Sequence, residues 1–252
     1  VGTDSFQEGQ IAGKAMGEFT QGRGAVFIIG FFAQDNLVLR KNGFISSVSD
    51  QYAGLRVKRV FDRSKLSDDE FFKEFQDALD DTPDLTGCYA AEMESLLSVV
   101  KLFKQSHRIG SVKIISHDLT DQIAGLIQEG SVTAAISQDP FIQGYDPVIH
   151  LANHLGAGWK PAAPRLLIQP VIVEAKNLGD HWKIGHGAVQ SAEMIAQRPK
   201  LNESIQSKPG NPIKIAMITP VDVSFFDQVK SGVLAAAKEC RAVNIQVEWL
   251  VA

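Results

Sequence analysis

Short apolar runs alternate with amphipathic stretches along most of the chain. Strands are predicted at 25–30, 55–61, 87–91, 112–116 and 132–137, and helices at 37–49, 67–82, 95–104, 120–128 and 143–155. Because strands and helices alternate, the pattern predicts an α/β fold, with a parallel sheet covered by helices on both faces. Ligands of such sheets bind beyond the carboxyl ends of the strands.

The pattern changes in the second half of the chain. A further strand is predicted at 165–173. Residues 179–210 are rich in Gly, Pro, Ser, Gln and Lys, which predicts a linker with a short helical patch. Residues 211–252 then read as one strand–helix–strand unit. Since a lone unit of this kind cannot bury a core, we expect it to add to a sheet formed elsewhere.

Composition and charge narrow the class of protein. The 252 residues carry 25 basic and 29 acidic side chains, a formal net charge of -4, and 44% are hydrophobic, as in soluble globular proteins. The mild acidity argues against a broad phosphate-binding surface. No apolar run approaches the ~20 residues of a membrane span, and no secretory signal is visible at the start, although a mature secreted protein would look the same.

Catalytic and metal-binding patterns are weak. His150 and His154 have helical spacing, but no third ligand is indicated, so surface histidines are the better interpretation. The glycines within 21–24 precede a strand and predict a tight turn, not a phosphate-binding loop. Cys88 and Cys240 lie in apolar patterns and are expected to be buried thiols. We therefore expect no enzyme activity, metal or cofactor.

Polar residues follow several of the predicted strands. Arg40 lies in the helix after the first strand, and Glu92, Asp118 and Gln138 follow the third, fourth and fifth strands. An arginine, two acids and an amide at one sheet edge could satisfy the donors and acceptors of a polyhydroxylated ligand. The alternative is local capping, in which Asp118 caps the helix that begins near Thr120 and a glutamate after the third strand caps the next helix.

Four segments carry a resemblance to a known fold. Residues 1–9 precede a helix of small residues, 115–120 and 134–140 read Ile-Ser-His-Asp-Leu-Thr and Ala-Ala-Ile-Ser-Gln-Asp-Pro, and 213–226 contain a strand and paired phenylalanines. This pattern resembles the type I periplasmic-binding-protein-like fold. That fold is shared by sugar-binding proteins of ABC transporters and by effector domains of LacI-family transcription regulators. The His-Asp-Leu-Thr segment is more typical of the regulators.

The resemblance implies two lobes, each a parallel sheet with helices on both faces, in an unusual order. Residues 1–140 match a complete second lobe, 141–178 match the return toward the first lobe, and 211–252 match the opening unit of the first lobe. In the family the unit at 211–252 comes first, and further elements of the first lobe separate it from Val1. A rearranged chain, an engineered fragment and a lobe completed by another molecule remain open as explanations.

The resemblance also implies a binding site. The residues that match ligand-contacting positions of the family are Arg40, Glu92, Asp118, Gln138, Asp222 and Phe225. Arg40 matches an arginine that hydrogen-bonds sugar hydroxyls, and Phe225 would stack on the ligand from the other lobe. Glu92 stands where Asn or Asp is more common, which leaves the identity of the ligand open.

The function expected first is therefore the effector-binding domain of a LacI-type regulator. A sugar or polyol would bind between the lobes and close them. Such a domain would be a cytoplasmic homodimer that reaches DNA only through a head domain outside this chain, without membrane contact. The alternative is a periplasmic solute-binding protein of a sugar ABC transporter.

Overall fold

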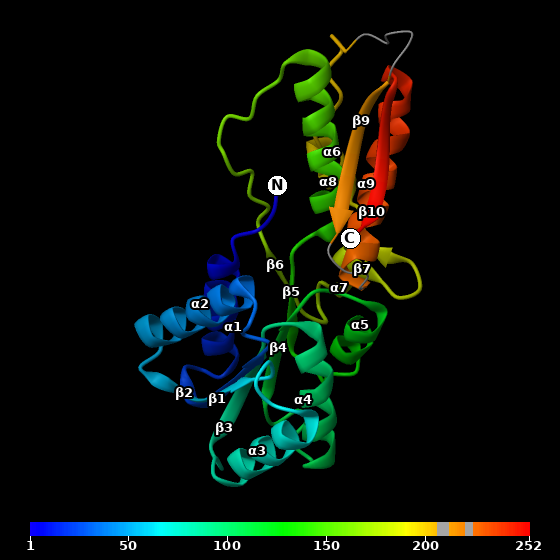
Figure 1. The fold of residues 1–252 in the computed structure, drawn as a ribbon. Coiled ribbons are helices and arrows are strands. Elements are labelled where there is room, and N and C mark those ends of the chain that lie inside the picture. Colours follow the sequence, from blue (N-terminus) through cyan, green and yellow to red (C-terminus); the bar gives the residue numbers. More distant parts are fainter. Residues whose placement is uncertain (206–211, 220–223) are drawn as a thin grey trace. The chain divides into compact units, whose positions relative to one another are not determined.

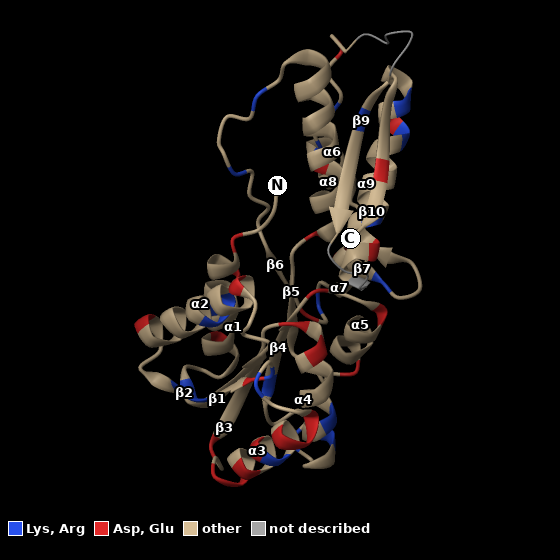
Figure 2. Ribbon diagram, viewed as in Figure 1, with Lys and Arg blue, Asp and Glu red and all other residues tan. Residues whose placement is uncertain are grey.

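The computed structural model describes residues 1–205, 212–219 and 224–252. The chain forms two compact units (Figure 1). Unit 1 comprises Val1–Thr3, Gln138–Gln169 and Ala188–Ala252, and unit 2 comprises Asp4–Ser137 and Pro170–Gly187. Figure 2 shows acidic and basic residues spread over the helices of both units. Within the described ranges, no helix has both the length and the apolar character needed to cross a membrane.

Unit 2 is an α/β unit built on a six-stranded sheet. Its strands are β1 (Arg23–Gly30), β2 (Gly54–Asp62), β3 (Leu85–Ala90), β4 (Lys113–His117), β5 (Ala134–Ser137) and β6 (Val171–Val173). Its helices are α1 (Ser5–Phe19), α2 (Asp35–Gln51), α3 (Asp68–Asp80), α4 (Met93–Gln105), α5 (Asp121–Gln128) and α7 (Leu178–His181). The strand order is β2-β1-β3-β4-β5-β6, and β1 to β5 are parallel, as predicted.

One strand prediction is wrong in length. The strand expected at 165–173 is reduced to Val171–Val173, which pairs antiparallel with β5. Pro170 lies directly before it, and proline cannot donate a ladder hydrogen bond. Before Pro170, Leu167 forms only an isolated parallel bridge with Gly2.

The helix starts follow capping rules. Ser67 caps α3: its hydroxyl accepts a hydrogen bond from the N–H of Glu70, and the Glu70 carboxylate accepts one from the N–H of Ser67 at 2.9 Å. Asp68 and Asp69 in the first turn add favourable charge at the helix N-terminus. The predicted start of this helix is therefore confirmed.

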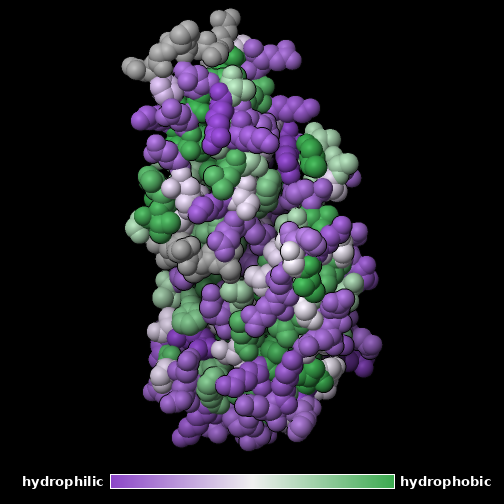
Figure 3. Space-filling model, turned by 90° about the vertical axis from the view of Figure 1, so that its right-hand side faces the viewer, coloured by the Kyte–Doolittle hydropathy of each residue, from purple (hydrophilic) through white to green (hydrophobic). Residues whose placement is uncertain are grey.

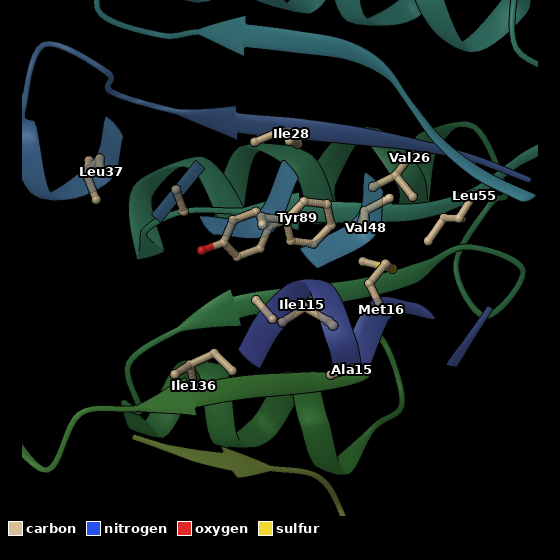
Figure 4. Close-up of a cluster of buried hydrophobic side chains, with 13 residues drawn as sticks. Ala15, Met16, Val26, Ile28, Leu37, Val48, Leu55, Tyr89, Ile115 and Ile136 are labelled. Carbon is tan, nitrogen blue, oxygen red and sulfur yellow. The ribbon is translucent and has the colours of Figure 1, made fainter. Parts of the chain in front are cut away.

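Helices cover both faces of the sheet. Val26 and Ile28 pack with residues of α1 and α2 in one cluster of buried side chains (Figure 4). Phe27, between them in sequence, has its ring against Phe75 of α3, at 5.6 Å between ring centroids. Successive residues of a strand point to opposite faces, so β1 supplies both cores. On the face drawn in Figure 3, hydrophobic residues are interspersed among hydrophilic ones.

Helices α1 and α2 cross with their backbones touching. A Cβ atom added at Gly9 would lie 1.9 Å from the carbonyl oxygen of Arg40, and one added at Gly43 would lie 2.0 Å from that of Phe6. Only glycine permits this approach at either position. The crossing sets the relative placement of the side chains next to these glycines.

Unit 1 contains the predicted strand–helix–strand unit. Its elements are α6 (Pro140–Ala157), α8 (Ala192–Gln197), β9 (Ile213–Thr219), α9 (Ser224–Cys240), a 3-10 turn (Arg241–Val243) and β10 (Ile245–Val251). Strands β9 and β10 form a two-stranded parallel sheet. Of the described residues, no other strand pairs with them, so the expected addition to a larger sheet is not observed.

Helix α6 provides the core that the strand–helix–strand unit lacks. Side chains of α6, including Tyr145 and Ile149, join those of α9, β9 and β10 in one buried cluster. The two helices approach through a second glycine pair, since a Cβ at Gly144 would lie 1.9 Å from the carbonyl oxygen of Val229, and one at Gly232 would lie 2.0 Å from that of Phe141. A packed helix thus replaces further strands as the partner that buries apolar area.

The segment predicted as a linker carries short elements. A hairpin of β7 (Trp182–Lys183) and β8 (Gly187–Ala188) follows α7, and the chain passes from unit 2 to unit 1 after Gly187. The Trp182 indole N–H donates to Asp121 Oδ1 at 2.8 Å, and the Gly185 N–H donates to Asp121 Oδ2 at 3.0 Å. This part of the segment is therefore held against the start of α5. The predicted domain boundaries otherwise stay predictions.

Candidate functional site

Three of the predicted site residues come together at the carboxyl edge of the unit 2 sheet. Glu92 follows β3 and Asp118 follows β4. Arg40 lies in the second turn of α2, and its Nη1 donates to the carbonyl oxygen of Ala91, next to Glu92, at 3.0 Å. The parallel strands bring their carboxyl ends to one edge, as the sequence predicted.

Arg40 is held in a buried ion pair with Glu8 of α1. Its Nε donates to Glu8 Oε2 at 2.6 Å, and the two residues are 4% and 0% exposed. Burial lowers the pKa of Arg40, but the charges of Glu8 and Asp118 outweigh this effect, so the pKa is raised. Arg40 is therefore a permanent cation close to Asp118.

Glu92 is the N-cap of α4. Its carboxylate accepts hydrogen bonds from the N–H of Ser95 at 2.7 Å and from the Ser95 hydroxyl. Burial nevertheless raises the pKa of Glu92 to about 7. The capping interpretation is confirmed for this residue, and its contact with a ligand stays a prediction.

Asp118 is not a helix cap. Thr120 caps α5, since its hydroxyl accepts from the N–H of Ile123 at 3.2 Å. Asp118 itself has a left-handed backbone conformation, with φ of 66°, and its N–H donates to the carbonyl oxygen of Ile136 at 2.9 Å. Aspartate tolerates this conformation better than most residues. The capping alternative for Asp118 is therefore wrong, and the half-buried side chain stays a candidate for ligand contact.

A second buried polar pair lies at the ends of β3 and β4. The Tyr89 hydroxyl is 2.7 Å from His117 Nε2, and both residues are fully buried. Burial, and then the charge of Arg40, lower the pKa of His117 well below its ordinary value. Burial raises the pKa of Tyr89. A neutral imidazole and a neutral phenol therefore adjoin the charged residues.

The remaining predicted site residues belong to unit 1. Gln138 is buried and accepts a hydrogen bond from the Thr3 hydroxyl at 3.3 Å. Phe225 lies in the first turn of α9, half-buried, with its ring edge-on to Phe226. Asp222 lies outside the described residues. The structure describes Gln138 and Phe225 within unit 1 alone, so the roles of all three residues stay predictions.

Sequence reasoning missed the role of Glu8. This acid belongs to the segment that carries the resemblance, yet no function was assigned to it. A signal was present, because the buried face of α1 otherwise consists of glycine, alanine and methionine. A charged residue on such a face needs a partner.

The structure also shows the surroundings of the histidines, cysteines and glycines considered in the sequence. Among the described residues, no group of three or more His, Cys, Asp or Glu side chains could hold a metal ion. His150 stacks on Trp159, with ring centroids 4.6 Å apart, and His154 Nδ1 is 2.7 Å from the Trp159 carbonyl oxygen. Cys88 and Cys240 are buried and free, as predicted. The predicted turn at 21–24 is confirmed by the left-handed conformations within it.

Comparison with known structures gives related folds. A glucose-galactose binding protein from Geobacillus stearothermophilus, GanP, is 27% identical, with a TM-score of 0.62, over 71% of this chain and 62% of that chain. A sugar-binding protein of a sugar ABC transporter from Bacillus halodurans is 26% identical, with a TM-score of 0.61, over 70% and 64%. A carbohydrate transporter solute binding protein from Agrobacterium radiobacter, in complex with D-arabinose, is 25% identical, with a TM-score of 0.59, over 71% and 61%.

The chain spans less than two thirds of the length of each of these structures. Comparison with curated protein sequences gives no match. The family described as "Periplasmic binding protein domain" matches residues 1–158, which is more than half of the chain. These residues include all of β1 to β5 and the helices between them. The chain therefore belongs to the periplasmic binding protein family and has its type I fold.

Proposed function

We propose that this chain binds a small sugar as the solute-binding protein of a sugar ABC transporter. The observation that carries the proposal is the convergence of Arg40, Glu92 and Asp118 at the carboxyl edge of the unit 2 sheet. A guanidinium donates hydrogen bonds and carboxylates accept them, which suits the hydroxyls of a sugar. The sugar-binding proteins with similar structures support this ligand class.

The other unit would complete the site. Gln138 would add an amide, and Phe225 an aromatic ring against the C–H face of the sugar. A ligand held by both units favours the closed state only by its differential affinity for that state. Asp222 remains a candidate from sequence alone. The sugar would leave unchanged, since the proposed role is binding and not catalysis.

A LacI-type effector domain is the second candidate. The His-Asp-Leu-Thr segment at 117–120 favours it, whereas the similarity to transport proteins favours the first. The two functions imply different properties. The transport protein would act as a monomer in the periplasm, and the regulator as a cytoplasmic homodimer with a DNA-binding head.

A thermal-shift screen tests the proposal. The chain is heated with D-glucose, D-galactose, D-arabinose and D-allose, and an increase in melting temperature is expected with at least one. Asp118→Asn keeps a residue that tolerates the left-handed backbone but removes the charge, so the shift should be lost. Asp77→Asn, at an exposed position of α3, is the matched control and should keep it.

A shift that survives Asp118→Asn would place the binding site elsewhere, and no shift with any sugar would contradict sugar binding. Sedimentation of the sugar-bound protein then separates the two candidates. A monomer supports the transport protein, and a stable dimer supports the regulator.

A further inference from the structure

The structure assigns Glu8 a role in the binding site. We propose that Glu8 is a positioning residue, which holds the Arg40 guanidinium in the orientation needed to donate to a ligand. This inference rests on the proposed function, because it concerns the same site. Glu8 itself is fully buried and would not touch the ligand.

The first observation concerns the hydrogen bonds that the Arg40 guanidinium makes. Arginine has five N–H donors in a planar fork. In Arg40, Nε donates to Glu8 and Nη1 to the Ala91 carbonyl oxygen. The other terminal nitrogen, Nη2, makes no hydrogen bond within the described part of the chain. Two anchored nitrogens fix the plane of the fork, and the remaining donors are free for a ligand.

The second observation is the rigidity of the helix pair that carries both residues. Gly9 follows Glu8 in sequence, and it packs so closely on the backbone of α2 that a Cβ would lie 1.9 Å from the Arg40 carbonyl oxygen. Gly43, one turn after Arg40, packs in the same way on the backbone of Phe6. The backbone crossing therefore fixes the spacing of the acid and the arginine.

The third observation concerns stability. Replacing a buried ion pair by apolar side chains is often neutral or stabilising, because desolvation offsets the attraction. Glu8 Oε1 is also buried without a hydrogen-bond partner in the described structure, which adds a cost. A contribution to stability alone therefore does not explain why Glu8 and Arg40 form a buried pair. The pair is explained if Glu8 keeps the Arg40 guanidinium charged and oriented at the candidate site.

Two variants of Glu8 grade the effect. Glu8→Gln keeps an acceptor oxygen without the charge, and Glu8→Ala removes both. Sugar affinity, measured by calorimetry with the sugar that shifts the wild type most, should fall from wild type to Gln to Ala. The expected loss for Glu8→Ala is on the order of ten- to hundred-fold, as for removal of a hydrogen bond to a charged group.

Val48→Ala is the matched control for general destabilisation. Val48 lies in the same helix as Arg40 and is buried in the core. Its truncation lowers stability through a cavity, but it leaves the ion pair intact and should leave sugar affinity unchanged. If Glu8→Ala lowers stability but keeps affinity within about two-fold, Glu8 is purely structural and the proposal is overturned.

A spectroscopic measurement separates this proposal from the proposed function. In the ligand-free wild type, the Arg40 side-chain Nε–H should give a slowly exchanging NMR signal, assigned by its absence in Arg40→Lys. The signal should be lost in Glu8→Ala. If it persists, Glu8 does not orient Arg40 and the proposal fails. If it is lost while the wild type binds none of the four sugars, sugar binding fails and the orienting role stands.

Discussion

The Tyr89 hydroxyl lies 2.7 Å from His117 Nε2, and both side chains are fully buried beside the candidate site. Tyr89 also stacks face to face on Phe44 of α2, with ring centroids 4.5 Å apart and an interplanar angle of 5°. It therefore links the sheet, the helix layer and the end of β4, directly before Asp118.

Replacing Tyr89 by Phe should lower the free energy of unfolding by about 1–3 kcal/mol, because His117 Nε2 is then buried without a partner. The stacked ring is kept, so the change isolates the hydroxyl. Urea unfolding at neutral pH measures the effect. An unchanged midpoint and slope would show that the pair contributes nothing to stability.

Glu92 predicts a pH dependence of stability. Burial raises its pKa from an ordinary value of 4.5 to about 7 in the folded protein. Between these values the folded state binds more protons than the unfolded state, so the Glu92 contribution to stability falls as pH rises and is constant above about 7. The loss amounts to about 3 kcal/mol.

The measurement compares urea unfolding of wild type and Glu92→Gln across this pH range. The variant lacks the titrating group, so the wild type should lose stability relative to it as pH rises. Glu74→Gln, at an exposed position of α3, is the control variant and should follow the wild type. Parallel curves for wild type and Glu92→Gln would mean that the pKa of Glu92 is not raised.

The helix crossing of unit 2 predicts opposite outcomes for two glycine substitutions. Gly43→Ala places a Cβ 2.0 Å from the Phe6 carbonyl oxygen, so the helices must separate, at a cost of at least about 2 kcal/mol. Gly125→Ala, in α5, meets nothing within 4 Å and should stabilise by about 0.5–1 kcal/mol. Thermal unfolding of both variants tests this, and equal effects would contradict the close crossing.

The Asp121 carboxylate predicts a local change in the hairpin. Asp121→Ala removes the acceptors of the Trp182 indole N–H and of the Gly185 N–H. Tryptophan emission should shift to longer wavelength, and amide exchange should accelerate in the hairpin while the core strands stay protected. Trp182→Phe identifies the contribution of this tryptophan. An unchanged spectrum in Asp121→Ala would mean that the hairpin is held by other contacts.

Much of unit 2 could be predicted from the sequence, for a specific reason. Strands such as Arg23–Gly30 are buried on both faces, which leaves near-continuous apolar runs that are easy to recognise. The first residues of helices such as α3 can be recognised from the capping residues that precede them. The short antiparallel strand Val171–Val173 was predicted too long, because the apolar residues before Pro170 form only an isolated bridge between Leu167 and Gly2.

The candidate site could be predicted only in part. The position of Glu92 and Asp118 at one sheet edge could be predicted, because parallel strands end at the same edge. The partner of Arg40 was not found, since Glu8 is 32 positions away and reaches it only through the glycine crossing. Such a contact depends on how two helices pack against each other. The local pattern of hydrophobic and polar residues carries no information about that packing. The roles of Gln138 and Phe225 depend on unit 1 and remain predictions.

The two native cysteines lie one in each unit, and both are fully buried. Burial raises the pKa of Cys88, and it raises that of Cys240 to about 11, so neither forms the thiolate that maleimide reagents attack. New cysteines at exposed positions, such as Lys73 in unit 2 and Lys238 in unit 1, could carry a fluorophore pair in the otherwise native chain. Energy transfer between the dyes would then report directly on movement of the units when a sugar is added.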